Sequence, residues 1–136
     1  RITQTAETIV LEYGRGLRRT IHMNLSAHPG DIEPSRAGHS IGRWDGDTLV
    51  VDTVGFAPGS LARDVPHSGQ LHVVERFTLD VDNMLLKREF VAEDPLYFGD
   101  SYAGSDQVLP ADAEFVIDEC KELAFEYITP EGDLRR

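Results

Sequence analysis

Short runs of alternating apolar and polar residues, separated by glycine- and proline-rich segments, fill most of this chain. Alternation with a period of two is typical of β-strands that are buried on one face, and helical spacing of apolar residues is almost absent. The pattern predicts two strands at Glu7–Tyr13 and Leu17–Met23, joined by a glycine turn. It predicts three hairpins further along, at 38–56, at 71–94 with a turn at Asp82-Asn83, and around Cys120–Glu122.

About eight short strands at close spacing predict an all-β domain. Because consecutive hairpins dominate, we expect a single-domain antiparallel β-barrel, a lipocalin-like up-and-down meander over residues 1–136. A two-sheet β-sandwich produces the same local signals and is the alternative. The segment 95–112 is expected to be a long loop, and Ser60–Asp64 is where a short helix could form.

The stretch GHSIGRWDGDTLVVDTVGF, residues 38–56, is the richest in candidate chemistry. If Asp45 and Gly46 form a two-residue turn, His39 pairs directly with Asp52 on one face of the hairpin. An imidazole fixed by a carboxylate among apolar side chains is typical of a general base or acid. The alternatives are a solvent-facing pair or a structural hydrogen bond, and a one-residue bulge would separate the two residues.

The predicted strand LHVVERF, residues 71–77, has candidate site residues on both faces. Glu75 lies on one face, and His72 and Arg76 lie on the other. If the face with Glu75 points inward, Glu75 is a buried carboxylate with a raised pKa or a cationic partner. If the other face points inward, His72 and Arg76 project into the barrel, where Arg76 could hold an anionic or carbonyl oxygen. A half-buried strand with a Glu–Arg surface network is the alternative.

Composition narrows the classes of partner. Thirteen basic and 24 acidic residues give a net charge of −11, which repels nucleic acid and anionic membrane surfaces. No apolar run reaches the ~20 residues that a membrane span needs.

The single cysteine excludes an intrachain disulfide and a cysteine-rich zinc site. Motifs for a zinc helix, a phosphate loop or a nucleophilic serine are absent from the sequence, so we expect neither a metal nor a cofactor. A homo-oligomer is compatible with the sequence.

Five segments occur in a fixed order: His28-Pro29, Glu33-Pro34, the 38–56 stretch, HSGQLHVVERF and Glu93–Pro95. Together they resemble an uncharacterised bacterial protein family with the signature GHSIGRW(D/E)GDTLVVDTVGF, over roughly Ile9 to Pro95. No activity comes with this resemblance. The family pattern singles out His28, Glu33, His39, Asp52, His67, His72, Glu75 and Arg76.

Members of this family often look exported, so the resemblance implies a periplasmic or secreted location, with the cytoplasm as the alternative. After Pro95 the chain departs from the family, because LYFGDSYAGSDQ lacks the Pro-Trp pair expected there. A ligand specificity that this loop sets in the family therefore does not carry over to this chain.

The favoured function is a metal-free acid–base enzyme of the lyase, isomerase or hydratase type, acting on a small, largely apolar organic molecule in a barrel pocket. The predicted catalytic residues are His39 as general base, Asp52 as its orienting partner, Arg76 as an oxygen clamp, and Glu75 or His72 as the second proton-transfer group. The predicted substrate-binding residues are His28, Glu33, His67, Trp44 and Tyr97.

Two other functions are compatible with the sequence. The alternative to the enzyme is a lipocalin-like carrier that binds a small hydrophobic ligand without chemistry. A structural or interaction domain of a larger assembly comes third. An enzyme requires His39, Asp52 and Arg76 to converge on one cavity, a carrier requires an apolar cavity with these groups outside it, and an interaction domain requires an exposed apolar patch.

Overall fold

The computed structural model describes residues 1–62, 64–117, 127–128 and 134–135. Within these residues the chain forms strands, turns and loops, and no helix. No helix that is long and apolar enough to cross a membrane occurs in this described part of the chain. The strands are β1 (Ile2–Gln4), β2 (Thr8–Glu12), β3 (Arg18–His22), β4 (His39–Asp45), β5 (Thr48–Val54), β6 (Gly59–Ala62), β7 (Val65–His67), β8 (His72–Asp80), β9 (Leu85–Glu93), β10 (Tyr102–Val108), β11 (Tyr127–Ile128) and β12 (Leu134–Arg135).

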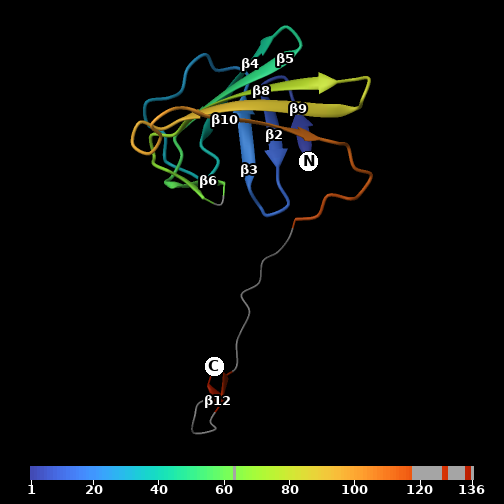
Figure 1. Cartoon of the computed structure of the whole chain (residues 1–136). Helices are drawn as coiled ribbons and strands as arrows, with labels where there is room; N and C mark the ends of the chain where they lie inside the picture. Colours follow the sequence, from blue (N-terminus) through green and yellow to red (C-terminus); the bar gives the residue numbers. More distant parts are fainter. Residues whose placement is uncertain (63, 118–126, 129–133, 136) are drawn as a thin grey trace.

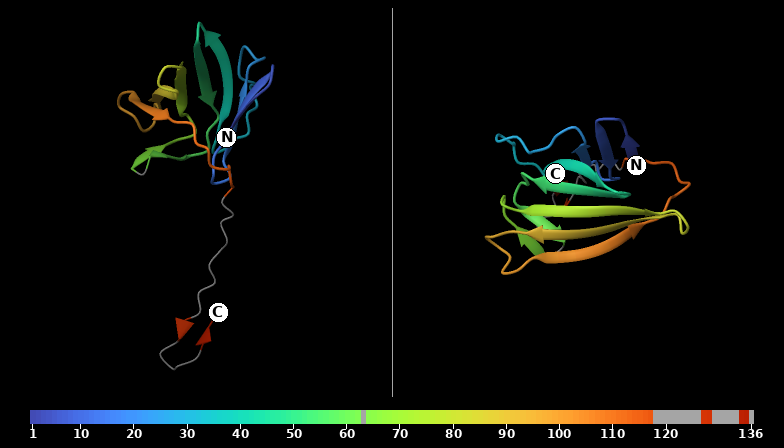
Figure 2. Two further views of the ribbon diagram at one scale, coloured as in Figure 1. Left: turned by 90° about the vertical axis from the view of Figure 1, so that its right-hand side faces the viewer. Right: turned by 90° about the horizontal axis from the view of Figure 1, so that it is seen from above.

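Eight of the strands form one curled sheet in the order β1-β2-β3-β4-β5-β8-β9-β10, and β6–β7 and β11–β12 form two small sheets. Strands β1–β3 run steeply across the direction of β8–β10, so the large sheet wraps around a concave face as a half-barrel (Figure 1 and Figure 2). The predicted all-β, barrel-like fold with about eight strands is therefore confirmed. The sheet is mixed, however, because β3 and β4 run parallel whereas the other neighbouring pairs are antiparallel.

The parallel pair follows from the connection between β3 and β4. Residues 23–38 form a long loop that returns the chain to start β4 beside the last residues of β3, with Ile21 opposite Ser40. A parallel pair needs a connection of about a dozen or more residues, which this loop provides. Backbone hydrogen bonds of Ser35 with Gly55 and Ala57 attach the loop to the end of β5. The sheet thus consists of two antiparallel parts, β1-β2-β3 and β4-β5-β8-β9-β10, that are joined by one parallel pair.

The concave face of the sheet buries the apolar positions of the alternating pattern. Burying an aliphatic or aromatic side chain stabilises the fold by about 1.5–3 kcal/mol, so these positions decide which face of each strand turns inward. Most of the buried apolar residues form two clusters, one with Ile9, Ile21, Leu49 and Val51, the other with Leu71, Val73 and Ala92.

The turn of the β4–β5 hairpin differs from the predicted one by one residue. Asp45 pairs with Thr48, so the two-residue loop is Gly46-Asp47 and not Asp45-Gly46. Gly46 has a φ of 61° and Asp47 a negative φ, which is the combination of a type II′ turn. An Asp45-Gly46 loop would instead be a type I′ turn, with the glycine in second place. Since a type II′ turn requires glycine in first place, the whole loop moves one residue towards the C-terminus.

Two further predictions about local structure are wrong. The option of a helix at Ser60–Asp64 fails because this region contributes to the β6–β7 hairpin, in which Gly59 pairs with His67. The predicted loop 95–112 contains β10, which is held in the sheet by pairing along its whole length with β9. The predicted hairpin around Cys120–Glu122 lies outside the described residues.

Candidate functional site

Four of the five histidines gather on the convex face of the sheet, together with Asp52. His22 lies on β3, His39 on β4 and His72 at the start of β8, whereas His28 comes from the long loop between β3 and β4. We call these five residues the histidine cluster. It includes three of the predicted catalytic residues and brings in one residue from the first meander of the sheet.

Strand pairing explains why these residues share a face. His22 pairs with Ile41, and Ile41 pairs with Asp52, so the three side chains point the same way. His39 is two residues before Ile41 on the same strand and therefore also points to the convex face. The pairing of β5 with β8 puts His72 on this face by the same alternation. The register of four adjacent strands thus places four members of the histidine cluster on one face, and His28 reaches them from the loop.

Asp52 binds two imidazoles, and a third ring is attached to one of them. Nε2 of His28 lies 2.8 Å from Oδ1 of Asp52, and Nε2 of His72 lies 2.9 Å from Oδ2. Nδ1 of His28 lies 2.8 Å from Nδ1 of His39. The His39 ring stacks on the His22 ring with 4.9 Å between centroids and 15° between planes. The contacts therefore form one chain from His72 through Asp52, His28 and His39 to His22.

Burial and neighbouring groups set the charge states in this chain of contacts. Burial raises the pKa of Asp52, but the hydrogen bonds from His72 and His28 outweigh it, so that this pKa lies below its ordinary value. Burial lowers the pKa of His39, and the neighbouring His22 and His28 lower it further. The histidine cluster therefore favours an ionised Asp52 beside a neutral His39.

The predicted direct pairing of His39 with Asp52 is wrong. His39 pairs with Val54, and Asp52 pairs with Ile41, because the turn lies one residue further along than predicted. A shift of the turn by one residue moves every cross-strand partner by two positions, so His39 and Asp52 stay on the same face. His28, predicted as a substrate-binding residue, fills the space between them and bonds to both.

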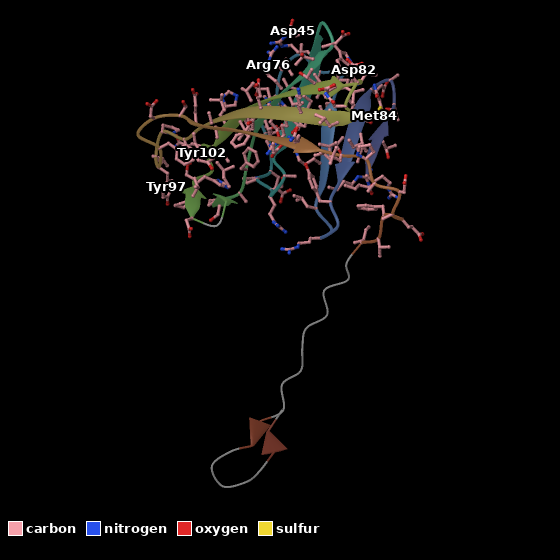
Figure 3. All side chains as sticks on the ribbon, turned by 45° about the vertical axis from the view of Figure 1, so that its right-hand side comes forward. Asp45, Arg76, Asp82, Met84, Tyr97 and Tyr102 are labelled. Carbon is pink, nitrogen blue, oxygen red and sulfur yellow. The ribbon has the colours of Figure 1, made fainter. Side chains whose placement is uncertain are left out.

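Arg76 does not converge with His39 and Asp52, contrary to the prediction. Its guanidinium lies 2.9 Å from the carboxylate of Asp45 near the tip of the β4–β5 hairpin, and both side chains are largely exposed (Figure 3). Arg76 pairs with Val50, which is two residues closer to the turn than Asp52. The register of β5 with β8 and the attraction of Asp45 thus hold this cation away from the histidine cluster.

The remaining predicted binding residues are dispersed. Trp44 lies on the concave face, where it lines the pocket described below. Tyr97 is exposed in the loop between β9 and β10 (Figure 3), and Glu33 is exposed in the long loop before β4. His67 is buried and its Nδ1 donates to the backbone oxygen of Ser68 at 3.0 Å.

A row of polar side chains crosses the concave face from β3 to β10. At its centre the side chain of Glu75, only 2% exposed, lies 2.6 Å from Nη2 of Arg19 and 2.7 Å from Nη1 of Arg88. Arg88 also bonds to the Asp106 carboxylate at 2.7 Å. Nη2 of Arg19 also lies 3.3 Å from the hydroxyl oxygen of Ser40 and 3.3 Å from that of Thr53. These two hydroxyl groups form a hydrogen bond with one another. We call Arg19, Ser40, Thr53, Glu75, Arg88 and Asp106 the polar row.

Of the alternatives for Glu75, the structure shows the buried carboxylate with cationic partners, and its pKa is lowered. Burial alone raises this pKa, and the hydrogen bonds and charges of Arg19 and Arg88 more than offset that effect. Guanidinium groups occupy both carboxylate oxygens. Glu75 is therefore an ionised group with fixed partners, on the opposite face from His39.

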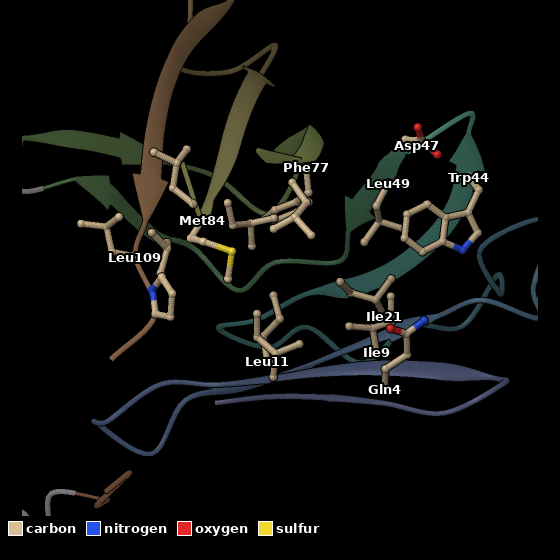
Figure 4. Close-up of a pocket in the computed structure, with 16 residues that line it drawn as sticks. Gln4, Ile9, Leu11, Ile21, Trp44, Asp47, Leu49, Phe77, Met84 and Leu109 are labelled. Carbon is tan, nitrogen blue, oxygen red and sulfur yellow. The ribbon is translucent and has the colours of Figure 1, made fainter. Parts of the chain in front are cut away.

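The concave face also contains an apolar pocket of about 440 Å³ (Figure 4). Leu11 and Ile21 face Phe77 and Met84 across this space. Of its 16 lining residues, only Gln4 and Asp47 have polar side chains. The pocket and the histidine cluster therefore lie on opposite faces of one sheet.

Sequence reasoning missed His22 and most of the polar row. Alternation within Leu17–Met23 indicates which residues share a face, but it does not indicate that β3 lies beside β4. The members of the polar row come from six different strands, so no spacing along the chain connects Arg19 with Glu75. Only the pairing of distant strands brings these residues together.

Within the described residues, no group of three or more His, Cys, Asp or Glu side chains is arranged to hold a metal ion. Comparisons with family models, with curated proteins and with solved structures found no match to this chain. Its function therefore has to be argued from the geometry of the two faces.

Proposed function

We propose that the protein binds a small, uncharged, largely hydrocarbon molecule in the apolar pocket of the concave face. The observation that carries this proposal is an open pocket with apolar walls in a chain that is otherwise rich in charge. Its volume of about 440 Å³ is within the usual range for sites that take small organic molecules.

The lining specifies the class of ligand. Aliphatic walls, with Trp44 and Phe77 as the aromatic members, gain most from hydrocarbon because each apolar contact removes surface from water. Asp47 is the charged group at the pocket, and it repels carboxylates and phosphates. The net charge of −11 acts in the same direction. An alcohol, amide or neutral aromatic compound fits these conditions better than a fatty acid anion.

Binding without chemistry is preferred over catalysis in this pocket because of the position of the titratable groups. The groups expected to act as base and orienting partner, His39 and Asp52, lie on the convex face. The buried carboxylate closest to the pocket along β8, Glu75, is fully engaged by arginines. A carrier that resembles lipocalins in using a concave β-sheet is the function that these positions support.

A neutral naphthylamine probe, N-phenyl-1-naphthylamine, tests the proposal directly. Trp44 is the only tryptophan and lines the pocket, so a bound probe accepts excitation energy from it and quenches its emission. We expect saturable quenching together with a rise in probe fluorescence. Leu79→Asp puts a carboxylate on the largely exposed pocket wall and should weaken binding roughly tenfold, equivalent to about 1.4 kcal/mol.

Val91→Asp is the matched control, because Val91 is a half-exposed apolar residue on the opposite face of the sheet. This variant should bind the probe as the wild type does. If neither quenching nor probe fluorescence appears, and sedimentation shows a dimer that Leu79→Asp dissociates, a second copy of the chain covers the pocket and the proposal is wrong.

A further inference from the structure

The hydrogen bonds of the histidine cluster determine which ring nitrogens carry protons. A carboxylate only accepts hydrogen bonds, so Nε2 of His28 must donate to Asp52. A neutral His28 then has no proton on Nδ1, and this nitrogen must accept. Its partner at 2.8 Å is Nδ1 of His39, which therefore donates. It follows that the neutral His39 ring carries its proton on Nδ1 and has a free electron pair on Nε2.

Nε2 of His39 is thus a basic atom in a fixed orientation. It makes no hydrogen bond with any residue that the structure describes. The Nδ1 bond to His28 fixes one edge of the ring, and the stack on His22 fixes its plane. The Nδ1–H form is also unusual, since free histidine side chains in water prefer the proton on Nε2.

We propose that the convex face carries a proton-transfer site in which Nε2 of His39 is the proton acceptor and His28 and Asp52 are its positioning residues. When an acid H–X reacts there, the H–X bond breaks, X keeps the electron pair, and an N–H bond forms on His39. The resulting positive charge is shared along the Nδ1–H bond to His28 and the Nε2–H bond to Asp52. In a catalytic triad a carboxylate orients an imidazole, which contacts the nucleophile. Here Asp52 orients His28, and His39 stands in the place of the nucleophile.

The surroundings of His39 restrict the class of substrate. The protein charge of −11 disfavours anions at the surface, so the substrate is a neutral or cationic molecule with a weakly acidic proton. His72 occupies the second oxygen of Asp52 at 2.9 Å, and its half-exposed ring stands beside the same carboxylate. The single proton of a neutral His72 is therefore engaged by this carboxylate, and the proton on Nε2 of His39 is the one that can return to the substrate. This site is independent of ligand binding on the concave face.

Nitrogen-15 NMR of the imidazole rings tests the proton positions. At about pH 8, where histidine is ordinarily neutral, we expect His39 in the Nδ1–H form, with His28 and His72 in the Nε2–H form. His28→Phe removes the acceptor and should return His39 to the Nε2–H form. His72→Phe is the matched control, since His72 bonds to Asp52 but not to His39, and it should leave the His39 form unchanged.

Chemical modification provides a readout that a purely structural role would not change. Diethyl pyrocarbonate forms an N–C bond to a free ring nitrogen, and the released ethyl carbonate takes up the ring proton and decomposes to carbon dioxide and ethanol. Peptide mass spectrometry should find His39 modified faster than His28, whose two ring nitrogens are both hydrogen-bonded, and severalfold more slowly in the His28→Phe variant.

The proposal is overturned if wild-type His39 carries its proton on Nε2, or if His39 reacts no faster than His28. The wild-type spectrum decides the first point even if His28→Phe does not fold. Neither result bears on probe binding in the apolar pocket, so the two proposals succeed or fail separately.

Discussion

Glu75 shows how a single buried charge depends on its neighbours. Its side chain is almost inaccessible to water, and both oxygens are held by Arg19 and Arg88. Removing one member of a buried pair is far more damaging than removing both, because the remaining charge has neither water nor a partner. Arg19 is the vulnerable group, since its own side chain is 12% exposed and its Nε has no hydrogen-bond partner among the described residues.

Glu75→Gln should therefore lower the free energy of unfolding by about 3–5 kcal/mol, measured by urea denaturation. Asp45→Asn is the control, because it breaks the exposed pair with Arg76 and should change the free energy much less. Equal and small effects in both variants would show that Glu75 and Arg19 do not form a buried pair.

At this scale the sequence predicted more about single residues than about their partners. Alternation on β8 correctly separated Glu75 from His72 and Arg76, and it allowed a buried Glu75 with a cationic partner. It could not say that the partners are Arg19 and Arg88, because those residues are 56 and 13 positions away on other strands. A periodic pattern reports the face of a residue, whereas a partner depends on the topology.

The β4–β5 hairpin shows what a turn decides at the scale of an element. Its strands and their faces follow from the apolar pattern, but the register depends on whether glycine occupies the first or the second turn position. Because of that one-residue difference, His39 and Asp52 are not directly opposite one another but lie diagonally across the two strands. His28 bonds to both of them. The parallel pairing of β3 with β4 was beyond prediction for a related reason, since no turn residue encodes a contact made through a long loop.

Gly46→Val should destabilise the hairpin by roughly 1–2 kcal/mol, the cost of a positive φ for a residue with a side chain. Gly30→Val is the matched control: a Cβ at either position would meet no atom within 4 Å, and only Gly46 has a positive φ. Thermal unfolding followed by circular dichroism measures both effects. A loss of stability that is the same for both variants would argue against the positive φ of Gly46.

At the scale of the whole molecule, acid should destabilise the protein in two stages. The pKa of His39 is lower in the folded protein, so the unfolded chain binds more protons as the pH falls below about 6.5 and the free energy of unfolding decreases. The pKa values of Glu75 and Asp52 are also lower in the folded protein. Their contribution is present above about pH 4 and is lost as the pH falls through the lowered values.

Urea denaturation between about pH 8 and 3 measures these stages. His39→Gln should remove most of the first decrease, and Glu75→Gln should flatten the second. Comparing each variant with the wild type at the same pH largely cancels the effect of net charge, which moves towards zero near the isoelectric point of about 4.7. A wild type that becomes more stable than His39→Gln between pH 7 and 5 would contradict the lowered His39 pKa.

The polar row has a consequence for how this sequence can change over time. Its charges alternate in sign from Arg19 through Glu75 and Arg88 to Asp106, and each belongs to a different strand. A mutation at one of them leaves a neighbour with an uncompensated charge, so a second mutation on another strand must accompany it. In any lineage that descends from this chain, the four positions should covary: they are inherited as a set, or they are replaced as a set.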